Sequence, residues 1–252
     1  MLESAGHARK LPRDEYRSNL GSLHDRLYEV QKTCWESGIG SIVVFEGWDA
    51  AGKGSAISAL TRRLEPRGFR LHPIQPPRSL ELEMPWLWRF WNRLPNYGEM
   101  AIFDQSWYGR VYQDRVARLT SERECEQGFG DITEFERTLT ADGYVLIKVF
   151  LHISRQEQAR RLKRLARDPL CDWQVSADVW RRHKLYAEHR TAAEEMLART
   201  GTEWGPWTIV DATSRRRANM RVFETVIRGL EDGLQRRGIQ APGREPAGVT
   251  GE

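Results

Sequence analysis

The feature that most constrains this chain is an apolar run that leads directly into a glycine-rich turn and a helical pattern. Residues Ile42-Val43-Val44 precede "FEGWDAAGKGSA", residues 45–56. A strand, a glycine-rich turn and a helix in this order direct backbone N–H groups and a helix N-terminus toward an anion. The order predicts a phosphate-binding loop, whose candidate residues are Gly47, Ala50, Ala51, Gly52, Lys53, Gly54 and Ser55.

This loop departs from the usual pattern, G-x-x-x-x-G-K-[ST], at one position. Gly54 stands where a Ser or Thr normally binds magnesium. Two residues could replace the missing hydroxyl. Ser55 lies one position late and would need a remodelled loop, whereas Asp49 lies within the loop and could bind Mg²⁺ carried by phosphates. A plain strand-to-helix turn with an exposed lysine is the alternative.

Strand and helix patterns alternate along the chain. Periodicity predicts strands at about 41–45, 70–74, 100–103, 145–153 and 207–210. It predicts helices at about 13–35, 53–64, 82–94, 107–120, 131–141, 154–167, 176–199 and 215–236. This alternation favours an α/β fold with a five-stranded parallel sheet covered by helices on both faces. We expect one domain over residues 13–236, a flexible tail at 1–12 and a disordered tail at 237–252.

Composition limits the location and the partners. The 252 residues suit one large domain, and no apolar run reaches the ~20 residues of a membrane helix. The three cysteines are odd in number and far apart, which favours reduced thiols in a cytoplasmic protein. The net charge of +4 permits an anionic substrate but does not by itself imply nucleic acid.

A second acid completes the candidate site. Asp104 ends the apolar run "AIFD", and the carboxyl ends of parallel strands are where ligands bind. Asp49 and Asp104 as metal ligands, with Lys53 on the phosphates, would form a magnesium-assisted phosphoryl-transfer site. The alternative for Asp104 is a helix cap, and both roles are compatible.

Two further segments have open interpretations. In "SRQEQARRLKRLAR" the basic residues share one helical face, which suits either a lid over phosphates or a solvated surface: Arg160, Lys163, Arg164 and Arg167. The aromatic residues of "WLWRFW", residues 86–91, favour core packing over a base-stacking pocket. His152, at the end of a strand, is interpreted as structural.

Four motifs carry a resemblance to a known family. They are "EGWDAAGKG", "LWRFWNRLPNYGEMAIFDQSWYGRV", "FERTLTADGYVLIKVFLHIS" and "PWTIVDA". Together they resemble the family-2 polyphosphate kinases from about residue 11 to 234. The motifs "SWYGRV" and "LWRFW" look closest to the polyphosphate:AMP phosphotransferase branch. The resemblance implies a three-layer, thymidylate-kinase-like P-loop fold with a helical lid at about 154–175. It also implies a homo-oligomer.

The resemblance implies a function and site residues. The family transfers a phosphoryl group, with Mg²⁺, between inorganic polyphosphate and a nucleotide such as AMP, ADP or a guanine equivalent. No nucleic acid or membrane partner is expected. By position, the catalytic residues would be Asp49, Lys53, Asp104 and Arg110. The polyphosphate contacts on the lid would be Arg160, Arg161 and Arg164. The family also has glycine at position 54.

Two departures from the family pattern leave alternatives open. Gln105 stands where the family usually has an arginine beside the transferred phosphate, and a neutral amide cannot replace that charge. Residues 171–174 lack the family's basic run. Either neighbouring arginines compensate, with Arg78, Arg110 and Arg115 as candidates, or the chain is a weak or silent member that binds ligands or regulates a partner. An ATP-dependent small-molecule kinase is the third hypothesis.

Overall fold

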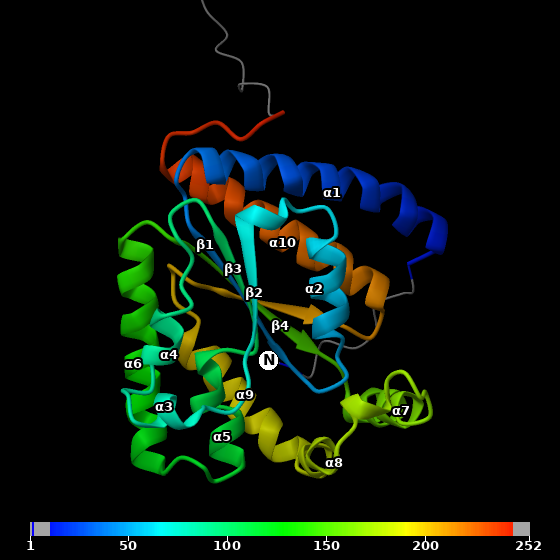
Figure 1. The fold of residues 1–252 in the computed structure, drawn as a ribbon. Coiled ribbons are helices and arrows are strands. Elements are labelled where there is room, and N and C mark those ends of the chain that lie inside the picture. Colours follow the sequence, from blue (N-terminus) through cyan, green and yellow to red (C-terminus); the bar gives the residue numbers. More distant parts are fainter. Residues whose placement is uncertain (1, 3–10, 244–252) are drawn as a thin grey trace, which may run out of the picture.

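Five parallel strands form the central sheet of the computed structural model, which describes residues 2 and 11–243. The strand order is β2-β3-β1-β4-β5, as Figure 1 shows. The bounds are β1 (Ser41–Gly47), β2 (Phe69–Pro73), β3 (Met100–Asp104), β4 (Val145–His152) and β5 (Trp207–Asp211). The predicted five-stranded parallel sheet is confirmed. Strand β1 pairs with β3 on one side and β4 on the other, so the loop that follows β1 emerges at the centre of the carboxyl edge.

Helices cover both faces of the sheet. The long helices are α1 (Arg13–Glu36), α6 (Glu122–Ala141), α9 (Tyr186–Thr200) and α10 (Arg215–Arg236). Helix α10 packs closely on β4, because a Cβ added at Gly233 would lie only 2.2 Å from Val145 Cγ2. Lys148 of the same strand contacts Glu136 of α6 instead, on the opposite face. Figure 1 shows α1, α2 and α10 on one side of the sheet, and α6 and α9 on the other.

The shorter helices surround the carboxyl edge. They are α2 (Lys53–Thr61), α3 (Ser79–Leu82), α4 (Trp88–Trp91), α5 (Gln113–Val116), α7 (Arg155–Leu165) and α8 (Ala177–Lys184). Three 3-10 turns are η1 (Pro66–Gly68), η2 (Trp107–Arg110) and η3 (Asp172–Gln174). The predicted lid interval, about 154–175, contains α7 and η3.

Four predicted helices differ from those observed. Within the predicted helix 82–94 only α4 is helical beyond Leu82, where α3 ends, and Pro85 lies between the two because proline disfavours a continuous helix. Segment 107–120 is η2 followed by α5, and 176–199 divides into α8 and α9 at Leu185. Helix α6 begins about nine residues earlier than predicted, where Ser121 and Glu124 form a capping box.

A buried ion pair fixes the segment that follows β3. Lys148 Nζ donates to Glu136 Oε2 at 2.8 Å, and both side chains are fully buried. Trp107 Nε1 donates to the same carboxylate at 2.9 Å, and the Tyr108 hydroxyl also donates to it. A buried charge pair tolerates the loss of one partner poorly. The network therefore anchors η2 and, with it, the residues at the end of β3.

Segments near both ends of the described chain pack on the domain. Leu11 and Ala241 are buried, so parts of both predicted tails pack on the domain, while residues 1, 3–10 and 244–252 lie outside the described residues. Cys34, Cys125 and Cys171 are free thiols. Within the described part, no helix combines the length and apolar character that crossing a membrane requires.

Candidate active site

The loop between β1 and α2 has a backbone that its glycines permit. Gly47 has φ +130°, and a Cβ there would lie 2.2 Å from the carbonyl oxygen of Leu151. Gly52 has φ +108°, and Ala50 adopts φ +60° although it is not glycine. Helix α2 begins at Lys53, so its first N–H groups, which have no partner within the helix, face the loop. The local geometry suits an anion.

Lys53 lies across this loop. Its Nζ donates to the carbonyl oxygens of Gly47 at 3.0 Å and Trp48 at 3.3 Å. Trp48 is buried and donates from Nε1 to Nδ1 of His152 at 2.7 Å, which supports the structural role expected for that histidine. Ser55 is exposed on the first turn of α2, and a Cβ at Gly54 would meet nothing within 4 Å. Space therefore does not explain the absent hydroxyl.

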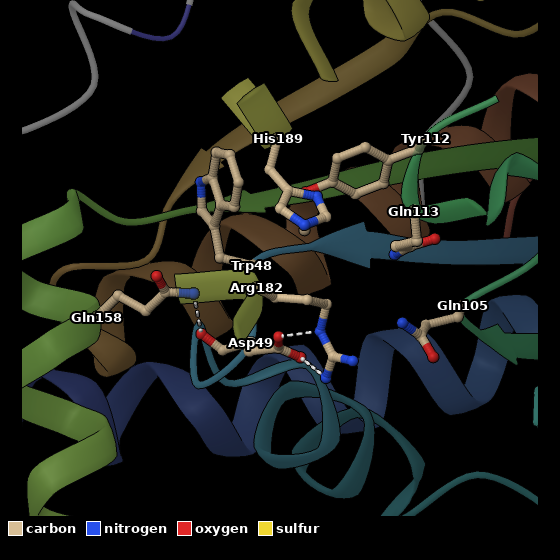
Figure 2. A pocket seen from close by; sticks show the side chains of 9 residues that line it. Trp48, Asp49, Gln105, Tyr112, Gln113, Gln158, Arg182 and His189 are labelled. Carbon is tan, nitrogen blue, oxygen red and sulfur yellow. Dashed lines mark hydrogen bonds and ion pairs between the residues drawn. The ribbon is translucent and has the colours of Figure 1, made fainter. Parts of the chain in front are cut away.

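Asp49 is held by groups from the two helices after β4. Arg182 of α8 donates from Nε to Asp49 Oδ2 at 2.6 Å and from a terminal nitrogen to Oδ1 at 3.2 Å (Figure 2). Gln158 of α7 donates to the backbone oxygen of Asp49 at 3.2 Å. His183 Nδ1 lies 2.8 Å from Gln158 Oε1, which extends this contact to α8.

Asp104 lies at the end of β3, in register with Phe45 of β1. The next residue, Gln105, has φ +62° and donates its N–H to the Phe45 oxygen at 3.0 Å. A non-glycine residue in this region is uncommon and clusters at functional sites. The end of β3 is therefore fixed against the start of the phosphate loop.

Glu46 is a buried acid beneath the loop. The Ser106 hydroxyl donates to its Oε1 at 2.9 Å, while Oε2 is buried without a hydrogen-bond partner. Burial raises the pKa of Glu46 to about 7; the Lys53 ammonium and Ser106 lower it, and the Asp104 carboxylate raises it. Both Lys53 and Asp104 thus lie close enough to Glu46 to act on its charge.

One pocket gathers much of the site. Its lining includes Gly47, Asp49, Gln105, Gln113, Gln158 and Arg182, together with Trp48, Tyr112 and His189. In Figure 2 the guanidinium group of Arg182 lies on the side of Asp49 that faces Gln105. The pocket therefore joins the loop after β1, the end of β3 and helix α8.

The carboxylates fit a magnesium ion carried by phosphates. Oxygen ligands are those that Mg²⁺ prefers, and one or two carboxylates plus phosphate oxygens are its usual protein sites. Asp49 and Asp104 are both partly exposed at this edge. Among the described residues no group of three or more His, Cys, Asp or Glu side chains could hold a metal alone. Phosphate oxygens would have to complete the coordination.

The arginines of α7 have different surroundings. Arg160 is exposed and pairs with Glu157, and Arg164 is exposed. Arg161 is 3% exposed, and its guanidinium donates to the carbonyl oxygens of four residues: Ala50, Ala51, Ala212 and Thr213. These contacts favour a supporting role for Arg161 beside the loop over the polyphosphate contact that was expected of it.

Arg110 lies away from this pocket's lining. It donates to Glu124 at 3.0 Å, and its guanidinium carbon lies 5.6 Å from the centre of the Trp86 ring. Trp86 donates to Asp131, whereas Phe90 is buried in the core and Trp91 is exposed beside Phe135. The aromatic run thus divides between packing and surface, and Arg110 with Trp86 forms a separate cationic-aromatic pair.

Several residues near the site were not predicted from the sequence. Glu46 and Lys148 are charged residues within apolar strands, which is a signal of a buried polar contact. Arg215, at the start of α10, carries a guanidinium whose pKa is lowered by burial and by the neighbouring charges of Arg164 and Arg161. It extends the basic surface of α7. Arg182 had no signal, because many arginines surround it in sequence.

Comparison with known proteins identifies similar chains. Residues 10–238 match the family described as Polyphosphate kinase 2. The polyphosphate:AMP phosphotransferase of Pseudomonas syringae pv. tomato is 35% identical over 94% of this chain and 47% of its own length. ADP-polyphosphate phosphotransferase 2 of Rhizobium meliloti is 35% identical over 89% of this chain and 73% of its own length.

Solved structures agree with this fold. The crystal structure of a polyphosphate kinase 2 described as putative, from Pseudomonas aeruginosa, has a TM-score of 0.87 at 33% identity and covers 90% of this chain and 49% of its own. Polyphosphate Kinase 2 from Arthrobacter aurescens has a TM-score of 0.87 at 27% identity and covers 97% of this chain and 87% of its own. The chain spans about half the length of the polyphosphate:AMP phosphotransferases that it matches.

Proposed function

The chain belongs to the polyphosphate kinase 2 family, and from that premise we propose that it transfers a phosphoryl group between inorganic polyphosphate and a nucleoside mono- or diphosphate. AMP and ADP are the first candidate acceptors. They are named for the relatives from Pseudomonas syringae and Rhizobium meliloti, and a relative from Pseudomonas aeruginosa is named for GDP. Mg²⁺ is the proposed cofactor.

One observation supports this proposal most directly. The charges of Lys53 and Asp104 both act on the buried carboxyl of Glu46, while Asp49 shares a pocket with Gln105, the neighbour of Asp104. These relations support an arrangement of two acids and one ammonium group at the carboxyl ends of β1 and β3. Such an arrangement suits phosphoryl transfer, which depends on positioning and charge more than on proton removal.

Each group then has a role. Asp49 and Asp104 would hold Mg²⁺, which neutralises charge on the phosphate oxygens when it is bound. The α2 N-terminus and Lys53 bind the transferred phosphate. The polyphosphate chain follows the basic surface of Arg160, Arg164 and Arg215, held by charge and counterion release as a nucleic-acid backbone is. Arg110, beside Trp86, would take the acceptor.

The partners and location follow from the same proposal. The proposed substrates are a nucleotide and an inorganic phosphate chain, so neither nucleic acid nor membrane is a required partner. A homo-oligomer is expected and is tested by light scattering after size exclusion. The three free thiols support a cytoplasmic location.

The test is an assay with purified protein, Mg²⁺, polyphosphate and AMP, ADP or GDP in turn, with the nucleotide products resolved. We expect a product one phosphate longer than the acceptor. Lys53→Ala and Asp104→Asn should each remove this activity, because the proposal assigns the transferred phosphate to Lys53 and the Mg²⁺ to Asp104. Product from ATP but not from polyphosphate would favour a small-molecule kinase.

A silent, ligand-binding member is the second candidate. The observation that favours it is the neutral Gln105 side chain on the pocket, since a guanidinium beside a transferred phosphate can contribute ~10³ or more in rate. Its signature would be polyphosphate binding without product from any acceptor. Gln105→Arg should then produce measurable activity.

A further inference from the structure

Arg182 is the arginine that the pocket contains. The nine lining residues include one acid, Asp49, and one arginine, Arg182, with three neutral amides around them: Gln105, Gln113 and Gln158. Arg182 lies on α8, after the predicted lid, and no motif points to it. Its guanidinium binds both oxygens of Asp49, at 2.6 and 3.2 Å.

The arginines considered as substitutes for a charge at position 105 do not line the pocket, and two of them pair with other residues. Arg115 donates to Glu195 at 2.6 Å, and Arg110 donates to Glu124 at 3.0 Å. Arg78 lies at the start of α3, where its backbone N–H donates to Glu81, and the residue is exposed. None of the three lines the pocket. Arg182 is therefore the arginine best placed to face a phosphate beside Gln105.

The ion pair between Arg182 and Asp49 is accessible to other ions. The two side chains are 38% and 21% exposed, so solvent and a bound ion can reach both charged groups. Arg161 behaves differently, since it is 3% exposed and donates to loop carbonyls. Arg182 contacts the loop through the side chain of Asp49, whereas Arg161 binds backbone oxygens of Ala50 and Ala51, so release of Arg182 leaves those backbone contacts in place.

We propose that Arg182 is a phosphate-binding residue that Asp49 holds in reserve. When the Asp49 carboxylate is taken up by a cation that the phosphates carry, the guanidinium is released toward the phosphate chain beside Gln105. This inference rests on the proposed function, because it assigns a polyphosphate to the pocket. The forked geometry of the Arg182 guanidinium suits phosphate oxygens, which a lysine would bind only as a point charge.

The test is a double-mutant cycle on binding, without metal. A fluorescent inorganic polyphosphate is titrated in EDTA against the wild type, Asp49→Asn, Arg182→Gln and the double variant. Asp49→Asn releases Arg182, so we expect it to tighten binding by about 3- to 10-fold. The same change in the Arg182→Gln background should then have little effect, because the residue that it frees is absent.

The matched control is Arg181→Gln. Arg181 is the preceding residue on α8, is exposed and pairs with Asp178 at 2.7 Å. We expect it to bind polyphosphate almost as the wild type does, with Arg182→Gln at least 5-fold weaker when Mg²⁺ is present. Arg182→Lys provides a second variant that keeps the charge, and thermal unfolding shows whether each variant is folded.

The outcomes separate the two proposals. Asp49→Asn tightening polyphosphate binding equally in both backgrounds would mean simple loss of a negative charge and would overturn the role of Arg182. Arg182→Gln matching Arg181→Gln would overturn it too. A wild type that binds polyphosphate but phosphorylates no nucleotide would contradict the proposed function and leave the cycle for Arg182 intact.

Discussion

The hydroxyl of Ser106 donates a 2.9 Å hydrogen bond to the fully buried carboxyl of Glu46. This contact joins the segment after β3 to the end of strand β1, where the phosphate loop begins. The Lys53 ammonium lowers the pKa of the same carboxyl, and the Asp104 carboxylate raises it. The charge state of Glu46 is therefore linked to the arrangement of the proposed catalytic groups.

Glu46 predicts a pH dependence of stability. Its pKa is about 7 in the folded protein against an ordinary 4.5, so the folded state binds a proton that the unfolded chain releases between these values. Stability from this group is present below pH 4.5 and is lost as pH rises to 7, by up to about 1.4 kcal/mol per pH unit.

The variant Glu46→Gln tests this, because its side chain is neutral throughout. Relative to it, the wild type should lose about 2–3 kcal/mol of unfolding free energy between pH 5 and 8 in urea titrations. Parallel pH curves for the two proteins would contradict this.

Gly47 predicts a steric requirement. An alanine there would place its Cβ 2.2 Å from the Leu151 oxygen at a φ of +130°. Gly47→Ala should therefore cost at least about 2 kcal/mol of unfolding free energy. Gly54→Ala is the control, because its Cβ would meet nothing within 4 Å, and a change within about 1 kcal/mol is expected. Equal destabilisation by both would show that the loop is not held as described.

Arg161 predicts a structural role where a ligand role was expected. Arg161→Gln removes donors from the carbonyl oxygens of Ala50, Ala51, Ala212 and Thr213. Buried acceptors without partners are costly, so we expect a loss of about 2–4 kcal/mol by urea unfolding. The adjacent Arg160, which is 65% exposed, gives the control Arg160→Gln, with a loss below about 1 kcal/mol. A reversed order would restore Arg161 to the phosphate surface.

A substitution at Arg164 tests whether polyphosphate binds the basic surface of Arg160, Arg164 and Arg215. Arg164 lies near Arg215, whose guanidinium is partly buried, and both residues reach the surface. Arg164→Gln should weaken polyphosphate binding and lower the slope of log affinity against log salt by about 0.7–1, with the melting temperature unchanged. Arg137→Gln on α6, whose exposed side chain pairs with Glu134, should change neither quantity. Equal effects of the two variants would indicate non-specific attraction to the whole surface.

Sequence reasoning reached the sheet because its signals were local. Apolar runs predicted all five strands, and the glycine pattern predicted the loop. Asp104 could be placed at the carboxyl edge because it ends a strand. The helix breaks at Pro85 and Leu185 were missed, since both lie inside continuous helical patterns.

The rest of the site depends on contacts that periodicity does not encode. Arg160 and Arg161 are neighbours in sequence, yet one is exposed and the other is buried against the loop, because adjacent helix residues point about 100° apart. Arg182 reaches Asp49 across 133 positions, and its role depends on the turn of the chain between α8 and α9. The residues that carry charge into the pocket are thus set by tertiary structure.

The most direct measurement is the nucleotide product formed by the wild type from polyphosphate, AMP or ADP, and Mg²⁺. We expect ADP or ATP whose formation depends on both polyphosphate and Mg²⁺ and is absent with Lys53→Ala. Folded protein that binds polyphosphate yet yields no product with AMP, ADP or GDP would contradict this expectation.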